Sequence, residues 1–320
     1  MLLNKNIKLI INYVLGPLVF LVLAYSIYRQ IGRQRDWLQS LQQIKKAVEG
    51  PRRWQIGMAV LLMPLNWGIE ARKWQLLIGS VGRISFRNAF KAVLTGTTLA
   101  SFTPNRMGEY LGRILYIPEG QRLRGISLTI AGSIAQLLVT LTAGVAGIFY
   151  LRERLDHPFI LFFTVIALWT ALTIIYFRLS WLVGLLDKSP AWGRYKKYIK
   201  VPQDFRANIL IRILFLSFLR YAVFMIQYQL LFSVFGTGLT GAQVWGGMSV
   251  VFLVMAIVPT FTFLTELGLR WEASIQIMEL FSGNTVGIFA ASFGIWLINL
   301  IIPALAGSLL ILSIKLFRNK

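Results

Sequence analysis

Six apolar segments of this chain are long enough, as α-helices, to cross the hydrocarbon core of a lipid bilayer. Such a crossing needs about 20 predominantly apolar residues, and the segments fall at residues 7–28, 54–71, 125–150, 159–177, 209–235 and 286–317. They recur over the whole 320 residues, of which 56% are hydrophobic. The pattern predicts an all-α, polytopic membrane helix bundle that forms a single integral membrane domain over residues 1–320.

The polar composition excludes several functional classes. The chain has no cysteine and one histidine, His157, so thiol chemistry is excluded, and neither a metal site nor a cofactor is indicated. Its formal net charge is +21. In a membrane protein such an excess of Lys and Arg is typical of segments that flank the spans and contact anionic headgroups. The predicted partners are therefore membrane lipids with anionic headgroups, and not nucleic acid.

Two further apolar segments predict helical hairpins that enter the membrane without crossing it. Residues 90–102 would be about 20 Å long as a helix, too short for a hydrocarbon core of about 30 Å. Residues 244–264 are apolar as well, and both segments run into charged stretches. The hairpins are therefore predicted at 89–118 and 244–280. The residues that favour a non-helical turn or a hinge are Pro104, Asn105, Gly108 and Pro259.

The two charged stretches share a spacing. Glu109 precedes Arg113 by four residues, and Glu266 precedes Arg270 by four, which on a helix brings each carboxylate to its guanidinium. At membrane depth such a pair lowers the desolvation cost of both charges. The repeated spacing predicts an inverted repeat, in which two broken helices meet in the interior and bring Arg106, Glu109, Glu266 and Arg270 together.

The distribution of Lys and Arg favours one of two topologies. With both hairpins re-entrant, six full spans place 22 Lys and Arg on one face and 10 on the other, and the positive-inside rule puts both termini in the cytoplasm. The alternative, eight full spans, divides the charge less clearly. We therefore expect a cytoplasmic-membrane protein with cytoplasmic N- and C-termini. Residues 33–50 predict an amphipathic helix at the membrane surface or a solvated helix packed on its neighbours.

These charged stretches resemble the lysylphosphatidylglycerol synthase/flippase transmembrane family, the flippase-like integral membrane proteins of bacteria and archaea. The resemblance is carried by residues 103–109, which match a Pro-Gly-Arg-x-Gly-Glu element, and by Arg113, Glu266, Arg270 and Glu272. Asn105 stands where the family usually has glycine, and residues 260–265 lack the glycines of the second family element. The sequence shows no soluble aminoacyl-transferring domain of the kind larger relatives carry, so the resemblance implies lipid translocation and not lipid synthesis.

The first functional hypothesis is a flippase-like transporter of an anionic or polyprenyl-phosphate lipid. Guanidinium groups bind phosphate oxygens bidentately and stay charged in any environment, while Glu side chains would balance them, contact an amine or couple protons. Arg220 lies inside its span, too deep to reach the membrane surface comfortably. The candidate substrate-binding residues are Arg106, Glu109, Arg113, Arg220, Glu266, Arg270 and Glu272.

Three alternatives remain open. The charges could form structural ion pairs alone. The chain could be a membrane-embedded lipid-modifying transferase with Glu109 as general base, but no catalytic constellation accompanies that residue, so we do not predict an enzyme. It could also be a non-transporting scaffold of an envelope glycosyltransferase, which would make an envelope-biosynthesis enzyme its partner. The sequence does not indicate an oligomeric state.

Overall fold

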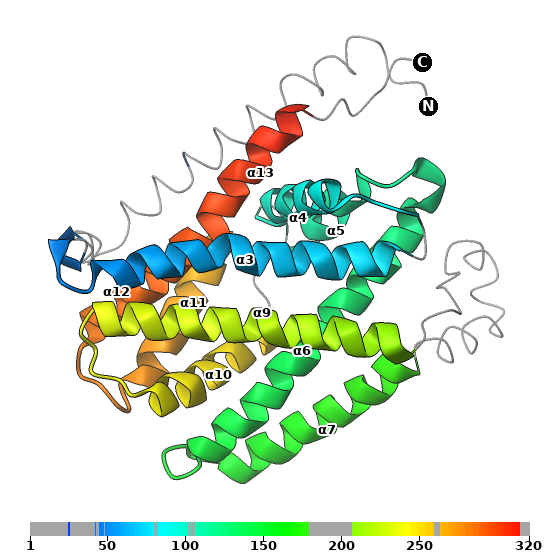
Figure 1. Cartoon of the computed structure of the whole chain (residues 1–320). Helices are drawn as coiled ribbons and strands as arrows, with labels where there is room; N and C mark the ends of the chain where they lie inside the picture. The colour runs from blue at the N-terminus through cyan, green and yellow to red at the C-terminus, as the bar shows by residue number, and fades with distance from the viewer. Residues whose placement is uncertain are drawn as a thin grey trace.

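The computed structural model describes residues 25, 42, 45–47, 49–79, 82–101, 103, 106–178, 207–258 and 263–313. Within these ranges the chain is helical and contains no strand (Figure 1). The predicted span at 7–28, apart from residue 25, and most of the predicted surface helix at 33–50 fall outside the described residues. Pro104, Asn105 and Pro259 lie outside them too. An all-helical bundle is confirmed for the part of the chain that the structure describes.

The longer helices are α3 (Arg53–Ile78), α6 (Arg122–Tyr150), α7 (Pro158–Phe177) and α9 (Ala207–Val234). The shorter ones are α4 (Phe86–Ala100), α5 (Gly108–Ile114), α10 (Gly241–Ile257), α11 (Phe263–Met278), α12 (Thr285–Trp296) and α13 (Ile302–Ser313). A 3-10 turn, η2 (Glu119–Gln121), precedes α6, and a π-helical segment, η4 (Leu297–Ile301), joins α12 to α13.

Several helices begin at residues that satisfy their free backbone N–H groups. Ser85 accepts from Asn88 N at the start of α4. Thr240 and Gln243 form a reciprocal capping box at the start of α10, which satisfies two of the backbone donors that every helix start leaves free. Asn284 accepts from Gly287 N at the start of α12. These caps fix where the elements that surround the interior begin.

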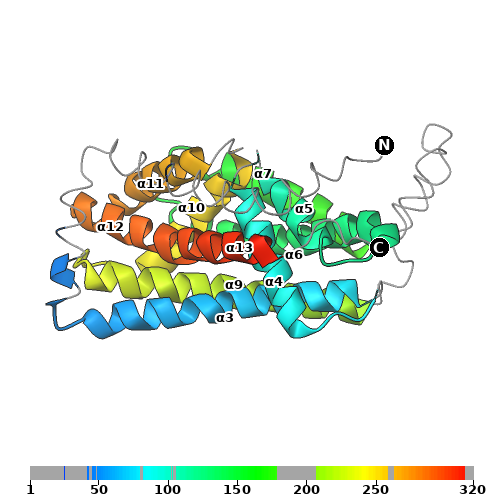
Figure 2. The same cartoon turned by 90° about the horizontal axis from the view of Figure 1, so that it is seen from above.

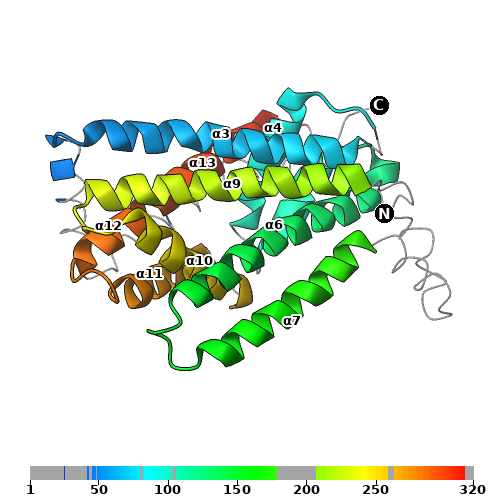
Figure 3. The same cartoon turned by 60° about the horizontal axis from the view of Figure 1, so that its bottom comes forward.

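Helices α3 and α9 lie side by side and run in opposite directions along the length of the bundle (Figures 1 and 3). The hairpin α4–α5 follows the C-terminal end of α3, and the hairpin α10–α11 follows the C-terminal end of α9. Because α3 and α9 are antiparallel, the two hairpins start from opposite ends of the bundle. Arg106, just before α5, lies 3.6 Å from Glu266 of α11, so the two hairpins approach each other.

The first hairpin is held together by glycines. A Cβ on Gly112 of α5 would lie 2.5 Å from the Cα of Gly96 on α4, so the two backbones are in direct contact at this point. A Cβ on Gly96 would in turn lie 2.9 Å from the carbonyl oxygen of Glu109. α4 also packs on α13, where the Thr98 hydroxyl donates to the carbonyl of Ala304 at 2.7 Å. The short hairpin is thereby fixed against the end of the chain.

Small residues also bring α6 and α10 close together. A Cβ on Gly147 would lie 2.7 Å from the carbonyl oxygen of Gly246, and one on Gly144 would lie 3.2 Å from Leu253. Close backbone approach through small residues is how helices pack where lipid supplies no hydrophobic drive. The contact places α6 against the second hairpin, and so the polar face of α6 borders the interior.

The last long apolar stretch is helical throughout its described length. α12, η4 and α13 form one continuous rod beside α9 (Figure 2), and the π-helical turn ends two residues before Pro303. A proline lacks the N–H that would bond the preceding turn, and a π-helical turn is one way to absorb the mismatch. This turn carries the buried Asn299, whose amide donates to Gln227 Oε1 at 2.9 Å.

Among the residues that the structure describes, four helical segments are long and apolar enough to cross a membrane: Arg124–Tyr150, Pro158–Phe177, Ala207–Val234 and Thr285–Ile311. Their exposed faces are apolar as well. On α7, Phe159 is 73% exposed and Phe163 is 66% exposed, which water would disfavour and lipid would not. α10 is also apolar but has only 17 residues. The chain therefore has the helices of a membrane protein.

Candidate functional site

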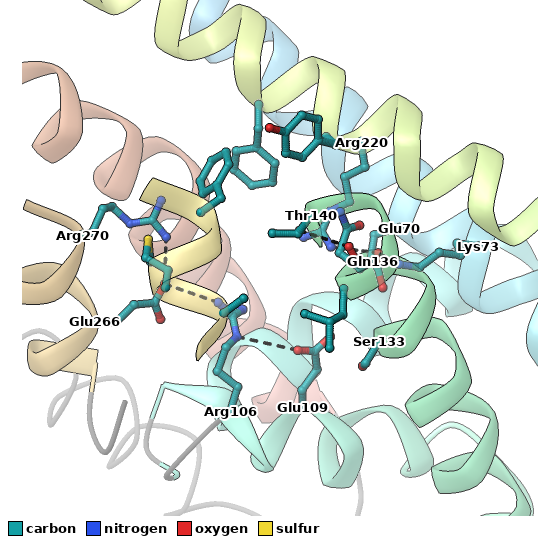
Figure 4. Close-up of a pocket in the computed structure, with 16 residues that line it drawn as sticks. Glu70, Lys73, Arg106, Glu109, Ser133, Gln136, Thr140, Arg220, Glu266 and Arg270 are labelled. Atoms are coloured by element: carbon teal, nitrogen blue, oxygen red, sulfur yellow. Dashed lines mark hydrogen bonds and ion pairs between the residues drawn. The ribbon is translucent and has the colours of Figure 1, made fainter. Parts of the chain in front are cut away.

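A cavity of about 360 Å³ lies where the two hairpins approach each other (Figure 4). Its walls come from α3, α6, α9, α10, α11 and the turn before α5. Charged side chains from α3, α9 and both hairpins form one part of the lining, and Phe224, Phe252 and Met255 form an apolar part. The cavity is thus amphipathic, with its ionic groups concentrated near the hairpin tips.

Glu70 on α3 is the most buried acid of the cavity. Its carboxylate lies 2.7 Å from Lys73 Nζ, 2.8 Å from Arg113 Nη2 and 3.0 Å from Arg220 Nη1. The side chains of Glu70, Lys73 and Arg113 are only 2–3% exposed. Arg220 also donates to Asn66 Oδ1 at 2.8 Å. Three cations therefore share one carboxylate, which compensates each of them only in part.

Glu109 connects this centre to the tip of the first hairpin. It pairs with Arg113 one helical turn away on α5, and it lies 3.8 Å from Arg106. Arg106 has a φ of 59°, in the left-handed region that residues other than glycine rarely adopt. Its guanidinium extends to Glu266 of the second hairpin at 3.6 Å. Arg106 is thus an ionic link between the two hairpins (Figure 4).

The second hairpin contributes its own pair. Glu266 and Arg270 are four residues apart on α11, with Oε1 and Nη2 at 3.0 Å. Arg270 also donates to the hydroxyl of Tyr228 on α9 at 3.1 Å. Both charged side chains are close to 10% exposed, against 36% for Arg106. The pair is therefore largely withdrawn from solvent and braced against α9.

The ionic groups form one continuous network with unequal charge. It contains five cations, Lys73, Arg106, Arg113, Arg220 and Arg270, and three carboxylates, Glu70, Glu109 and Glu266. The formal excess is two positive charges. Buried charge without a counter-ion is costly, so the network as it stands would be stabilised by an anion in the cavity.

The structure brings together most of the predicted site residues. Arg106, Glu109, Glu266 and Arg270 meet in the interior, as the repeated spacing predicts, and Arg113 and Arg220 join them through Glu70. Glu272 does not: it is exposed and accepts from Gln276 at 2.8 Å.

Gly108 does not provide the positive φ of the turn, which falls on Arg106. Gly108 is the first residue of α5 and is packed against Leu99, where a Cβ would not fit. Its missing side chain therefore serves close packing at the hairpin tip. The helix that follows can then present Glu109 and Arg113 toward α3.

The sequence analysis missed Glu70 and Lys73. The second span was predicted to end at residue 71, whereas α3 continues through Pro64 to Ile78 and buries both side chains. The spacing Asn66, Glu70, Lys73 places all three on one face of a helix. That periodicity was the available signal, because polar residues that share one helix face point to a buried site more than to a loop.

A second, smaller cavity of about 40 Å³ lies on the other side of the network. Five residues line both cavities: the charged Arg106, Arg220, Glu266 and Arg270, and the aromatic Phe224. The far wall comes from α3 and from the π-helical turn, through Asn299 and Leu300. The ionic network therefore forms a thin partition between two spaces in the bundle.

Comparisons with known proteins leave the family open: no protein-family model matches the chain, and no curated protein matches it. Among the residues that the structure describes, no three His, Cys, Asp or Glu side chains gather as a metal site would require. The geometry itself therefore carries the functional argument.

Proposed function

We propose that this chain is a flippase-like transporter, which moves an anionic or polyprenyl-phosphate lipid across the cytoplasmic membrane. The observation that carries the proposal is the buried cavity whose network holds two more cations than carboxylates. Guanidinium groups match the oxygens of a phosphate. The resemblance to the lysylphosphatidylglycerol synthase/flippase transmembrane family agrees with this activity, and we propose membership of that family.

The apolar part of the cavity supports a lipid ligand over a soluble anion. Phe252 packs against Tyr221 and Phe224, with ring centroids 5.8 Å and 6.3 Å apart, and Met255 continues this wall along α10. A headgroup phosphate could sit among the cations while the glycerol backbone and the start of the acyl chains contact the aromatic wall. An inorganic anion would leave that apolar wall without a partner.

The arrangement of the two hairpins suggests how a lipid would cross the membrane. We propose that α4–α5 and α10–α11 are re-entrant and enter from opposite leaflets, which gives the inverted arrangement that many transporters use, with six full spans and cytoplasmic termini. Arg106, Arg220, Glu266 and Arg270 would then separate the large cavity from the small one. Exchange of the phosphate for Glu266 as the partner of Arg106 would let the partition open.

This geometry favours transport over the other two candidate functions. Glu109 is engaged by Arg113 and lies near Arg106, so it serves as a counter-ion and is poorly placed as the general base of a transferase. A scaffold would need no cavity lined by buried cations. A membrane-embedded network of this kind is costly, which points to a role in binding.

The test measures movement of tail-labelled anionic and zwitterionic phospholipids in proteoliposomes. Arg106→Ala is the informative variant, since Arg106 makes the two longest ion pairs of the network, at 3.6 and 3.8 Å, and its removal should leave the fold intact. Arg122→Ala is a matched control, because Arg122 is also 36% exposed with an ion pair at 3.8 Å, but lies at the outer end of the hairpin.

We expect Arg106→Ala to slow the movement of the anionic lipid by about 10- to 100-fold, because the variant loses one hydrogen bond to a charged group. Arg122→Ala should move the same lipid at the wild-type rate. Equal lipid movement by wild type, Arg106→Ala and protein-free liposomes would reject transport. A chemically altered lipid in the same assay would favour the transferase.

A further inference from the structure

One wall of the large cavity carries polar groups without charge. Ser133, Gln136 and Thr140 lie on α6 and all line the cavity. Their spacing of three and four residues places them on one face of the helix. In Figure 4 they lie on the side of the cavity away from Glu266 and Arg270. This row was not among the residues that the sequence singled out.

The hydrogen bonds of this row leave acceptors facing the cavity. The Ser133 hydroxyl donates to the carbonyl of Thr129 at 3.2 Å, and the Thr140 hydroxyl donates to the carbonyl of Gln136 at 3.1 Å. A hydroxyl has a single proton to donate, so both oxygens retain only lone pairs. Gln136 donates through its amide nitrogen to the carbonyl of Ser217 at 3.4 Å.

The oxygen of Gln136 is the key atom. Gln136 Oε1 is buried and has no hydrogen-bond partner among the residues that the structure describes. The opposite wall is rich in donors, and Arg270 Nε there is also buried without a partner in the described part of the chain. In Figure 4 Lys73 and Arg220 lie on the same side as Gln136, and Arg270 lies across from it, so the cavity presents cationic donors on both sides and uncharged acceptors on α6. A phosphate alone cannot satisfy both kinds of group.

We infer that the lipid accepted by this cavity carries hydroxyl groups next to its phosphate, and that Gln136 and Thr140 accept hydrogen bonds from them. The ligand class is thus a polyol-phosphate or sugar-phosphate lipid. A headgroup ammonium would also donate, but it would add positive charge to a network that already has two cations in excess. This inference rests on the proposed function and narrows its substrate.

The experiment compares two lipids that differ in the hydroxyls alone. Phosphatidylglycerol and phosphatidylethanol are both phosphodiesters with one negative charge, and only the first carries headgroup hydroxyls. Proteoliposomes containing tail-labelled versions of each are compared for wild type, Thr140→Val and the double variant Gln136→Leu/Thr140→Val. Thr170→Val is the matched control, because Thr170 makes the same bond to its own helix, at 2.8 Å, on the exposed face of α7.

We expect wild type to move phosphatidylglycerol about 10-fold faster than phosphatidylethanol, or more, because only phosphatidylglycerol can donate a hydrogen bond to the buried acceptor. The double variant should lose this preference and move the two lipids at equal rates, and its melting temperature in detergent, compared with that of wild type, shows whether it is folded. Thr140→Val, an isosteric change, should lose part of the preference, and Thr170→Val none.

Two results would overturn the inference. If wild type moves both lipids equally fast, or the double variant slows both by the same factor, then Ser133, Gln136 and Thr140 do not recognise headgroup hydroxyls. The proposed transport of anionic lipids would not be contradicted by that result. If wild type moves neither lipid, the proposed function fails and this inference fails with it.

Discussion

Replacing Glu70 by Gln tests whether charge balance holds the interior together. Glutamine keeps the shape of the side chain but removes the negative charge that lies within 3.0 Å of Lys73, Arg113 and Arg220. The formal excess of the network rises from two positive charges to three. Lys73 and Arg113 are buried and Arg220 is 15% exposed, so the charges left without their counter-ion are largely withdrawn from water.

The magnitude follows from the burial of the group. Removing one partner of a buried ion pair costs about 3–5 kcal/mol, because it leaves an uncompensated charge. For a chain of this size, about 2 °C of melting temperature is lost per kcal/mol. Glu70→Gln should therefore lower the melting temperature in detergent by about 6–10 °C. Glu272→Gln, an equal change at an exposed carboxylate, should shift it by no more than about 1 °C.

A double variant separates charge from packing. Glu70→Gln/Lys73→Met removes one cation together with the anion, so the formal excess returns to two, and we expect it to recover part of the lost stability. The melting curves are followed by intrinsic fluorescence of the purified protein. The reasoning is refuted if Glu70→Gln and the Glu272→Gln control have the same melting temperature, or if the double variant is less stable than Glu70→Gln alone.

Two further changes test the hairpin and the partition. Gly112→Ala should lower stability by about 1–3 kcal/mol through overpacking. Gly57→Ala should raise it by about 0.4–1 kcal/mol, because a Cβ at that position meets nothing within 4 Å. Melting temperatures of the two variants that shift in the same direction would contradict this prediction. In the naturally cysteine-free chain, Ala256→Cys in the large cavity should react with a hydrophilic maleimide, and Leu300→Cys in the small one should react only after Arg106→Ala. Equal labelling of Leu300→Cys with and without Arg106 would show that Arg106 does not separate the cavities.

The helices themselves were largely predictable, because in lipid a long apolar segment can hydrogen-bond its backbone N–H and C=O groups in few ways other than as a helix. The predicted spans at 125–150, 159–177 and 209–235 agree with α6, α7 and α9 to within a few residues. The apolar run at 244–264, predicted as part of a hairpin, is not one continuous helix. α10 ends at Ile257, and Val258 is extended, with a ψ of 118°, since the residue before a proline avoids helical geometry. The shorter helix favours a hairpin.

The site was only partly predictable, because it depends on distant partners. Glu109 with Arg113, and Glu266 with Arg270, could be found from spacing within one helix. The contacts of Glu70 with Arg113 and Arg220 join residues 43 and 150 positions apart. No local pattern reports such contacts. A single sequence could place charges at membrane depth, but it could not show that one carboxylate would serve three cations.

The network also suggests an order for its assembly during synthesis. Each acid emerges from the ribosome with a base on its own helix: Glu70 with Lys73 on α3, Glu109 with Arg113 on α5, and Glu266 with Arg270 on α11. Each of these three acids can thus enter the lipid together with a cation that compensates its charge.

Arg106 and Arg220 are the two cations left over, and both line the two cavities. The surplus charge that would recognise a phosphate is therefore carried by the residues whose partners come from other helices. Nascent chains halted before α11 should expose Arg106 without Glu266, so the binding site would be completed only when the last third of the protein has joined the bundle.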